Sequence, residues 1–422
     1  MTDRPVSPFA HLTDEEMEEL GREFAAIHEE VYSDLGERDR RYITGVIRAH
    51  RLLGTAGRAM LAGSRSKPLW LLGTATLAAA KILENMELGH NILHGQWDWM
   101  NDPYIHSSTW DWDTASTAEA WKHSHNYIHH TYTNIRGKDK DLGYEIMRID
   151  PKQEWSPAYL LQPLYNLLLM GLFEWGVALH DLDLEAVRER RKPLKDVWHD
   201  LKGISGKARD QIVKDYVGWP AVSAAAAAGL EAVRATPARP TRRRGRSGLK
   251  DAVAGRLGGV PTAARDGFVA TFWADITANL IRNLWTHSII FCGHFPDQTY
   301  TFSQEEVENE TKGGWYARQL VGAANITGSP LFHLMSGNLG YQVEHHLYPD
   351  MPSSRYSEIA PRVRDICERY RLPYNTGPFS QQLGMVHRTI LRLAFPGGSP
   401  RPKPGPYRAD ESERSDRPAV AA

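Results

Sequence analysis

Apolar residues recur along this chain at the three- and four-residue spacing of an amphipathic helix. The alternation of apolar and polar residues that indicates a strand is nearly absent. Near the N-terminus, Thr13 precedes a run of acidic residues, which is typical of a helix N-cap. We therefore expect an all-α chain. The stretches with helical spacing are 75–94, 158–180, 183–214 and 268–292.

Three segments raise the question of a membrane, although none reaches twenty uninterrupted apolar residues. Hydropathy alone favours buried core helices, and the mean hydropathy of −0.47 is that of a water-soluble chain. The tryptophans that bracket these segments favour a membrane interface instead, so both interpretations stay open. The segments are KPLWLLGTATLAAAKI (67–82), SPAYLLQPLYNLLLMGLF (156–173) and NLWTHSIIFCG (283–293), with a weaker one at 216–230.

Charge and cysteine content exclude several classes of protein. Lys and Arg number 50 and Asp and Glu 51, so the net charge of −1 gives no attraction to nucleic acid. The two cysteines, Cys292 and Cys367, lie far apart, which excludes a disulfide framework and thiolate-bound zinc or iron–sulfur clusters. The acidic, polar N-terminus does not resemble a secretory signal.

Two segments differ from the rest in composition. Residues 232–266 are rich in Ala, Arg, Pro and Gly and contain no aromatic residue, and we expect them to be poorly ordered. Their basic run, Arg242 to Arg246, is typical of a solvated loop and indicates no nucleic-acid binding. The C-terminal segment 391–422 has the composition of a disordered tail.

Histidine is concentrated in one part of the chain, because the 41 residues from His90 to His130 contain seven of the 18 histidines. In GHNILHG, His90 and His94 have the i, i+4 spacing that places two rings on one face of a helix, as two ligands of one ion require. The zinc-protease pattern H-E-x-x-H is not met, since Asn91 stands where the glutamate would be.

The second cluster is HSHNYIHH, residues 123–130. His125 and His129 repeat the i, i+4 spacing, and His130 lies about 100° around a helix from His129. Two neighbouring rings that diverge so widely can serve two ions on either side of the helix. Spacing alone leaves His123 undecided, because it shares a helix face with His130.

The third cluster is YQVEHHLYP, in which His345 and His346 are adjacent and Gln342 precedes them. The three clusters supply seven histidines and one amide, enough ligands for two metal ions. Imidazole without thiolate indicates iron, copper or zinc. A haem protein is the weaker alternative, because haem needs only two axial ligands and leaves the adjacent pairs unexplained.

The motifs HNILH, HNYIHH and QVEHH, in this order, resemble the three histidine boxes of the membrane-bound fatty acid desaturases. The segments KILENMELGHN, HHTYTNIRGKDKDLGY, RNLWTH and FCGHFPD resemble the bacterial acyl-CoA and acyl-lipid branch of that family. The resemblance covers residues 35–390. It implies a helical membrane protein with two transmembrane hairpins and a cytosolic helical cap that holds a di-iron centre.

The resemblance also implies the ligands. An Asn-x-x-x-His element on the last span would add His287 as a ligand, with Asn283 acting through water, and Gln342 and His294 are further candidates. His123 falls outside the boxes and is expected to have a supporting or structural role. The iron ligands implied by the boxes are His90, His94, His125, His129, His130, His345 and His346.

The implied reaction introduces a double bond into a fatty acyl chain, carried by coenzyme A or a lipid, with O₂ and two external electrons. The sequence contains no G-x-G-x-x-G loop, cysteine cluster or His-Pro-Gly-Gly motif, so a separate ferredoxin or flavin reductase is expected. A lipid hydroxylase, or a metal-binding membrane protein without turnover, are the alternatives. Four tryptophans are candidates either to line an acyl slot or to pack at the interface: Trp97, Trp99, Trp110 and Trp112.

The implied topology is a multi-pass protein of the cell membrane whose active site faces the cytoplasm. The basic connector 183–215 would lie on that side, and 156–180 would be an interfacial or re-entrant helix. The arginine run would then face outward, so 219–266 is either an insertion or a locally altered stretch. The expected spans are 52–66 with 67–88 and 216–240 with 267–293, and the expected regions are 1–50, 51–390 and 391–422.

Overall fold

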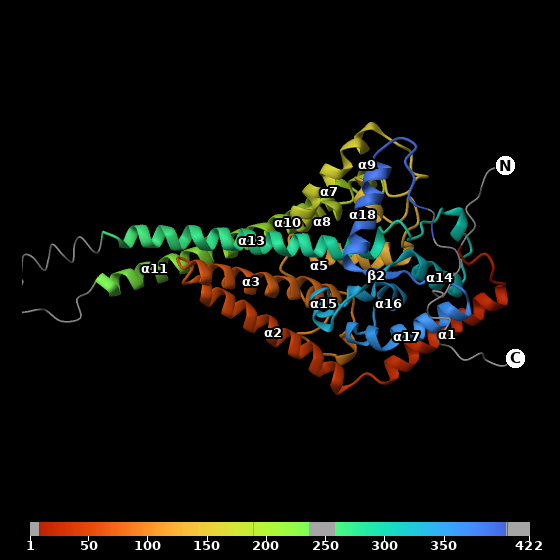
Figure 1. Cartoon of the computed structure of the whole chain (residues 1–422), viewed down its shortest axis with the longest axis horizontal. Coiled ribbons are helices and arrows are strands. Elements are labelled where there is room, and N and C mark those ends of the chain that lie inside the picture. The colour runs from red at the N-terminus through yellow and green to blue at the C-terminus, as the bar shows by residue number, and fades with distance from the viewer. Residues whose placement is uncertain (1–7, 189, 236–257, 402, 404–422) are drawn as a thin grey trace, which may run out of the picture.

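The computed structural model describes residues 8–188, 190–235, 258–401 and 403. Helices account for most of this part of the chain, which confirms the all-α prediction (Figure 1). Within the described residues, β1 (Asn325–Thr327) and β2 (Thr376–Pro378) form one short parallel pair. The helices divide into an elongated arm and a body that holds the histidine clusters.

Four helices lie side by side and form the arm (Figure 1). A π-helical segment, Glu84–His90, and the short α4 (Asn91–Leu93) continue α3 into the body. A second π-helical segment, Ile212–Gly218, joins α10 (Leu194–Gln211) to α11. The four helices are α2 (Glu37–Leu61), α3 (Lys67–Leu83), α11 (Trp219–Ala235) and α13 (Val260–His294).

Small residues allow the arm helices to approach closely. A side chain at Gly57 of α2 would meet the backbone of Leu77 of α3 at 3.0 Å. A side chain at Gly267 of α13 would meet the Ser223 carbonyl oxygen of α11 at 2.8 Å. These two contacts join α2 to α3 and α11 to α13, so the helices of each expected hairpin pack together, and their crossing of a membrane stays a prediction.

Residues 219–266, which include the segment of unusual composition, differ in part from expectation. Residues 219–235 form α11, and α13 begins at Val260, so the predicted poor order is wrong for 232–235 and 260–266. The physical reason is packing between the two helices, because Ala227 and Ala263 are both buried. Residues 236–257, which include the arginine run, lie outside the described residues.

The helices are less apolar than expected for membrane spans. Among the described residues, no helix combines the length and the apolar character that crossing a membrane requires.

The N-terminal helix α1 (Asp14–Ser33) lies at the outer edge of the body (Figure 1), and it begins at the predicted N-cap Thr13 with a capping box. Leu20 and Phe24 of α1 are fully buried against α14 (Lys312–Gly322) and α17 (Tyr356–Arg369). The remaining helices of the body are α5 (Ala118–Trp121), α6 (His130–Tyr132), α7 (Gln162–Gly171), α8 (Phe173–His180), α9 (Leu184–Arg188), α15 (Pro330–Met335), α16 (Gln342–Leu347) and α18 (Phe379–Leu393).

Candidate metal centre

The histidine boxes come from three places in the fold. His90 ends the π-helical segment that continues α3, and His94 follows α4. His125 and His129 lie on a further π-helical segment, Lys122–His129, which continues α5. π-helical segments are rare and occur frequently at functional sites. The third box lies on α16, so elements far apart in the sequence meet at one point.

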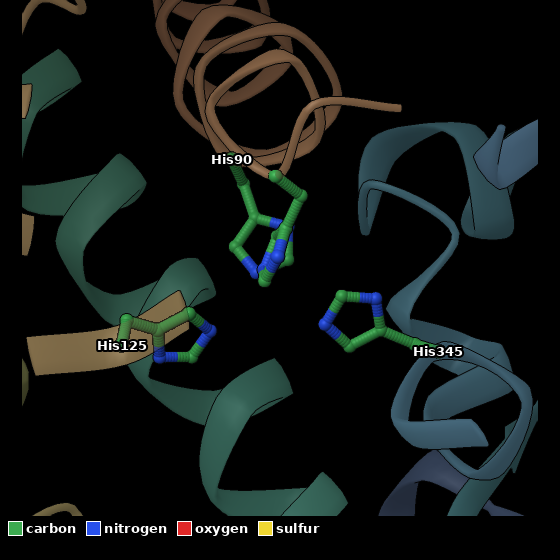
Figure 2. Close-up of side chains that lie close together, drawn as sticks. His90, His125 and His345 are labelled. Carbon is green, nitrogen blue, oxygen red and sulfur yellow. The ribbon is translucent and has the colours of Figure 1, made fainter. Parts of the chain in front are cut away.

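The structure arranges these side chains in two groups. The nitrogens of the first group, His90, His94, His125 and His345, all lie within 4.8 Å of one another. Figure 2 shows His90, His125 and His345 pointing into one common space. The second group consists of His129, His294 and His346, whose nitrogens also lie within 4.8 Å of one another. The i, i+4 pair His125 and His129 is thus divided between the groups.

His130 lies between the two groups. Its ring centroid is 4.7 Å from that of His94 and 4.6 Å from that of His346. Both of its ring nitrogens are buried and have no hydrogen-bond partner. His130 can therefore turn a nitrogen toward either group, and the expectation that His129 and His130 serve two different ions stays a prediction.

Most of the histidines are held by the nitrogen that faces away from the centre. The Nδ1–H of His90 donates to Asn91 Oδ1 at 3.0 Å, and that of His346 donates to Gln319 Oε1 at 3.1 Å. The Nδ1–H of His345 donates to the Tyr356 hydroxyl at 3.2 Å. Such bonds fix the tautomer and aim Nε2 inward, which is the usual support of a metal-binding histidine.

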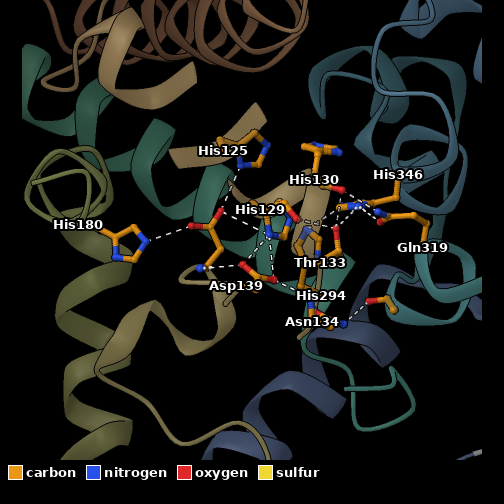
Figure 3. A network of polar contacts seen from close by, with 12 residues as sticks. His125, His129, His130, Thr133, Asn134, Asp139, His180, His294, Gln319 and His346 are labelled. Atoms are coloured by element: carbon orange, nitrogen blue, oxygen red, sulfur yellow. Dashed lines mark hydrogen bonds and ion pairs between the residues drawn. The ribbon is translucent and has the colours of Figure 1, made fainter. Parts of the chain in front are cut away.

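Two carboxylates hold the second box. His129 Nδ1 lies 3.0 Å from Asp139 Oδ1 and 3.7 Å from Asp141 Oδ2, and His125 Nδ1 lies 3.2 Å from the same Asp141 oxygen. Figure 3 shows His125, His129 and Asp139 in this network. Burial would lower the pKa of His129, but the charges of the two aspartates outweigh it and raise that pKa.

The other imidazoles are kept neutral. Burial, reinforced by the neighbouring rings, lowers the pKa well below its usual value for His94, His130, His345 and His346. Neutral imidazole is the form that binds metal. These four imidazoles are therefore in the metal-binding form at neutral pH.

The inward-facing nitrogens fit metal ions. The Nε2 atoms of His94, His125, His129 and His345 are buried without a hydrogen-bond partner, and an unsatisfied buried polar atom is costly. His346 Nε2 lies 3.3 Å from His294 Nε2, although the hydrogen of His346 is engaged at Nδ1. Two nitrogens bound at a right angle about 2.1 Å from one ion are about 3.0 Å apart, so this pair has the spacing of two ligands.

Comparison with known proteins assigns the chain to a family. The fatty acid desaturase family profile matches residues 67–378. An NADPH-dependent stearoyl-CoA 9-desaturase of Mycobacterium tuberculosis is 42% identical over 391 residues, which cover 93% of this chain and 83% of that protein. The chain belongs to the fatty acid desaturase family. Its function is fatty acid desaturation, and it is an oxidoreductase.

More distant relatives are also desaturases. An sn-1 linoleoyl-lipid 6-desaturase of Synechocystis is 25% identical over 323 residues, 74% of this chain and 76% of that protein. An acyl-lipid (8-3)-desaturase of Mortierella alpina is 23% identical over 304 residues, 68% of this chain and 56% of that protein.

The desaturase does not bring the predicted Asn-x-x-x-His element to the centre. His287 Nε2 lies 3.1 Å from Asn166 Oδ1 of α7, and its ring stacks on Phe291. Asn283 donates to the Gly171 carbonyl oxygen at 3.0 Å. The centre lies at the end of α13, two turns beyond His287, where His294 is the last helical residue. The geometry therefore places His294 where the resemblance placed His287.

The remaining candidates lie as follows. Gln342 Nε2 is 3.0 Å from His294 Nε2, and Gln342 Oε1 is buried without a partner. Because amide oxygen and nitrogen are interchangeable by a flip, Gln342 can present its oxygen to the second group. His123 is exposed, its ring lies beside Tyr127, and it belongs to neither group.

Sequence reasoning missed the groups that support the ligands. The signal for Asp139 and Asp141 was present in GKDKDLGY, directly after the second box. Asn91, Gln319 and Tyr356 carried no local signal, because only the folded chain brings them to the histidines.

A small cavity adjoins the first group. It has a volume of about 60 Å³ and reaches His90 and His125. Of the four tryptophans expected at an acyl slot, Trp112 lines this cavity, and Trp110 packs against the cluster that contains Trp112 and Trp121. Trp97 and Trp99 pack in another core region. Its other apolar walls are Met86, Trp121, Phe173, Val177 and Ile290.

Proposed function

We propose that this desaturase holds two irons, one at each histidine group, and acts on a fatty acyl-CoA in a membrane. The observation that carries the proposal is the pair of groups, in which the inward Nε2 atoms of His94, His125, His129 and His345 are buried without a hydrogen-bond partner. Iron is preferred to zinc because desaturation is an oxidation and zinc has no redox chemistry. When bound, the two irons supply the activation of O₂ that allows two hydrogens to be removed from adjacent saturated carbons.

The protein's own residues orient and shield this chemistry. Asp139 and Asn91 keep Nδ1 protonated on His129 and His90, so that the Nε2 lone pairs face inward. The absence of thiolate among the donors leaves no ligand that is easily oxidised. Burial of the groups keeps bulk water from the reacting carbons.

The cavity beside the first group supports binding of an acyl chain. Trp112, Trp121 and Phe173 give it apolar walls next to His90 and His125. The 42% identity to a protein named as a stearoyl-CoA desaturase favours a coenzyme A thioester over a lipid-linked chain.

We further propose a multi-pass protein of the cell membrane whose centre faces the cytoplasm. Charged residues in the arm lower its hydropathy, but one group of them is paired inside the arm. Arg58 lies 2.8 Å from Asp215 and 2.5 Å from Asp275, and Lys81 lies 2.6 Å from Asp215. The side chains of both aspartates are 0% exposed. Paired charges inside a helical bundle are compatible with a lipid-facing exterior.

The exterior of the arm and body supports this location. Large exposed apolar patches mark interaction with membranes or partners. On the arm, the exposed apolar side chains include Leu71, Leu72, Val222, Leu230, Val233 and Trp273. Beside it, α7 and its flanks expose Leu160, Leu161, Leu164, Leu167, Leu168 and Leu172, which favours an interfacial position for this segment.

The two electrons are proposed to come from a separate ferredoxin or flavin reductase. The sequence has neither a dinucleotide-binding loop nor a cysteine cluster, and the mycobacterial relative is named as NADPH-dependent.

The chemical proposal is tested on protein purified in detergent. We expect two irons per chain and, with reductant, O₂ and stearoyl-CoA, a product with one new double bond. His129→Ala should abolish turnover, whereas His123→Ala, a matched change in the same segment, should retain most of it. Absence of iron from the active wild type would refute the di-iron proposal, and a hydroxylated product would favour the hydroxylase.

The location is tested in cells. We expect the protein to stay in the membrane fraction at alkaline pH and to be released by detergent. Because Cys292 and Cys367 are buried, a single cysteine at the exposed position Lys195 can report its side of the membrane. A membrane-impermeant maleimide should label Lys195→Cys only after lysis, and labelling of intact cells would contradict a cytoplasmic centre.

A further inference from the structure

The loop that carries Asp141 has an unusual backbone. Three consecutive residues adopt positive φ angles: Gly143 at 73°, Tyr144 at 52° and Glu145 at 59°. Only glycine adopts this conformation without strain, so the surroundings must hold the other two residues in place. Such strain clusters at functional sites, and this loop lies directly against the second histidine box.

His180, the last residue of α8, contacts this loop on the side that faces away from the two histidine groups. Its Nε2 lies 3.1 Å from Asp141 Oδ1, and its Nδ1 lies 3.6 Å from Glu145 Oε2. Its ring packs 5.3 Å from that of Tyr144, and its side chain is 6% exposed. Figure 3 shows His180 reaching toward the histidine boxes from a separate helix.

Asp141 is the one carboxylate near both metal groups among the described residues. Its Oδ2 accepts the hydrogen of His125 Nδ1 at 3.2 Å and lies 3.7 Å from His129 Nδ1. His125 belongs to the first group and His129 to the second. His125 and His129 do not depend equally on Asp141. His129 also donates to Asp139, whereas Asp141 is the acceptor that the structure gives His125.

The two oxygens of Asp141 therefore have different tasks. Oδ2 supports the ligands, and Oδ1 accepts from His180. Each oxygen is therefore engaged by an imidazole, and these bonds from two sides hold the plane of the carboxylate. Without His180, Oδ1 loses this donor and the carboxylate is free to turn.

We propose that His180 is a positioning residue for the first metal site, acting through Asp141 on the orientation of His125. This inference rests on the proposed function, in which the histidine groups hold iron. It predicts an asymmetry: loss of His180 weakens the iron held by the first group, while the second group keeps Asp139. A merely structural role for His180 would weaken both sites together or neither.

The test measures iron affinity and not turnover. Apoprotein in detergent is titrated with Fe(II) against a competing chelator. Loss of a group that supports a ligand typically lowers metal affinity by about 10- to 100-fold, so His180→Ala should weaken one of the two irons by that factor and leave the other within about threefold. His180→Gln keeps an N–H that can reach Asp141 and should restore most of the loss.

The controls separate the possible outcomes. His123→Ala should bind both irons as the wild type does, and circular dichroism of each apoprotein checks the fold. Two irons of wild-type affinity in His180→Ala would overturn the inference, as would equal weakening of both sites with no rescue by glutamine. A wild type that binds no iron would overturn the proposed function, and the inference with it.

Discussion

Replacing His294 by alanine removes one of the three imidazoles of the second metal group. Its Nε2 lies 3.3 Å from His346 Nε2, the spacing of two ligands on one ion. Loss of a residue that only supports a ligand lowers metal affinity by about 10- to 100-fold. Loss of a ligand should therefore cost at least about 100-fold, or about 2.7 kcal/mol of binding free energy.

The matched comparison is His287→Ala, seven residues earlier on the same helix. This change removes the hydrogen bond to Asn166 and should lower the free energy of unfolding by about 1–3 kcal/mol, but both irons should remain. Fe(II) titration of the two apoproteins against a chelator gives the number of sites and their affinities. Under the conditions that load two irons into the wild type, His294→Ala should hold one and lose desaturation.

The opposite pattern would refute the reasoning. If His287→Ala lost an iron while His294→Ala kept both, the Asn-x-x-x-His element would be the ligand, and α13 would have to be turned or shifted relative to the body. Thermal unfolding of each apoprotein separates loss of a ligand from loss of the fold.

Two further predictions concern stability. Arg58→Ala leaves Asp275 buried without its partner at 2.5 Å, so the free energy of unfolding in detergent should fall by about 3–5 kcal/mol; an unchanged melting temperature would contradict the pairing. Burial raises the pKa of Asp350, but the hydrogen bond and charge of His28 and the hydrogen bond from Tyr32 together outweigh it, and the pKa is lowered. Its contribution is therefore present above about pH 4 and lost as the pH falls through the lowered value. Asp350→Asn should lower the free energy of unfolding by about 1 kcal/mol at pH 7 and by less near pH 3. Urea unfolding at both pH values measures this, and the same difference between variant and wild type at both would refute it.

The sequence was most informative where geometry is local. His90 and His94 share one group because His94 lies four positions after His90 on the helical stretch that continues α3. The helical class and the N-cap at Thr13 also follow from local spacing.

The choice between His287 and His294 could not be made in this way. The two lie seven residues apart and share a face of α13, so periodicity treats them alike. Only the position of the body along the helix decides which one reaches the other histidines. The same holds for Asp141, whose approach to His125 depends on a loop with positive φ angles at Tyr144 and Glu145. No residue type at these positions signals that conformation.

The π-helical segments at Glu84–His90 and Lys122–His129 have a consequence for how these histidine boxes tolerate change. A π-helical turn contains one residue more than an α-helical turn. If the same residues formed regular α-helix, one residue would be left over and every following side chain would rotate by about 100° relative to the preceding helix. In the second segment, this rotation would turn His129 and His130 away from both metal groups. The extra residue in the π-helical turn is thus as much a part of the box as the histidines, and a regular α-helix of the same length would be inactive.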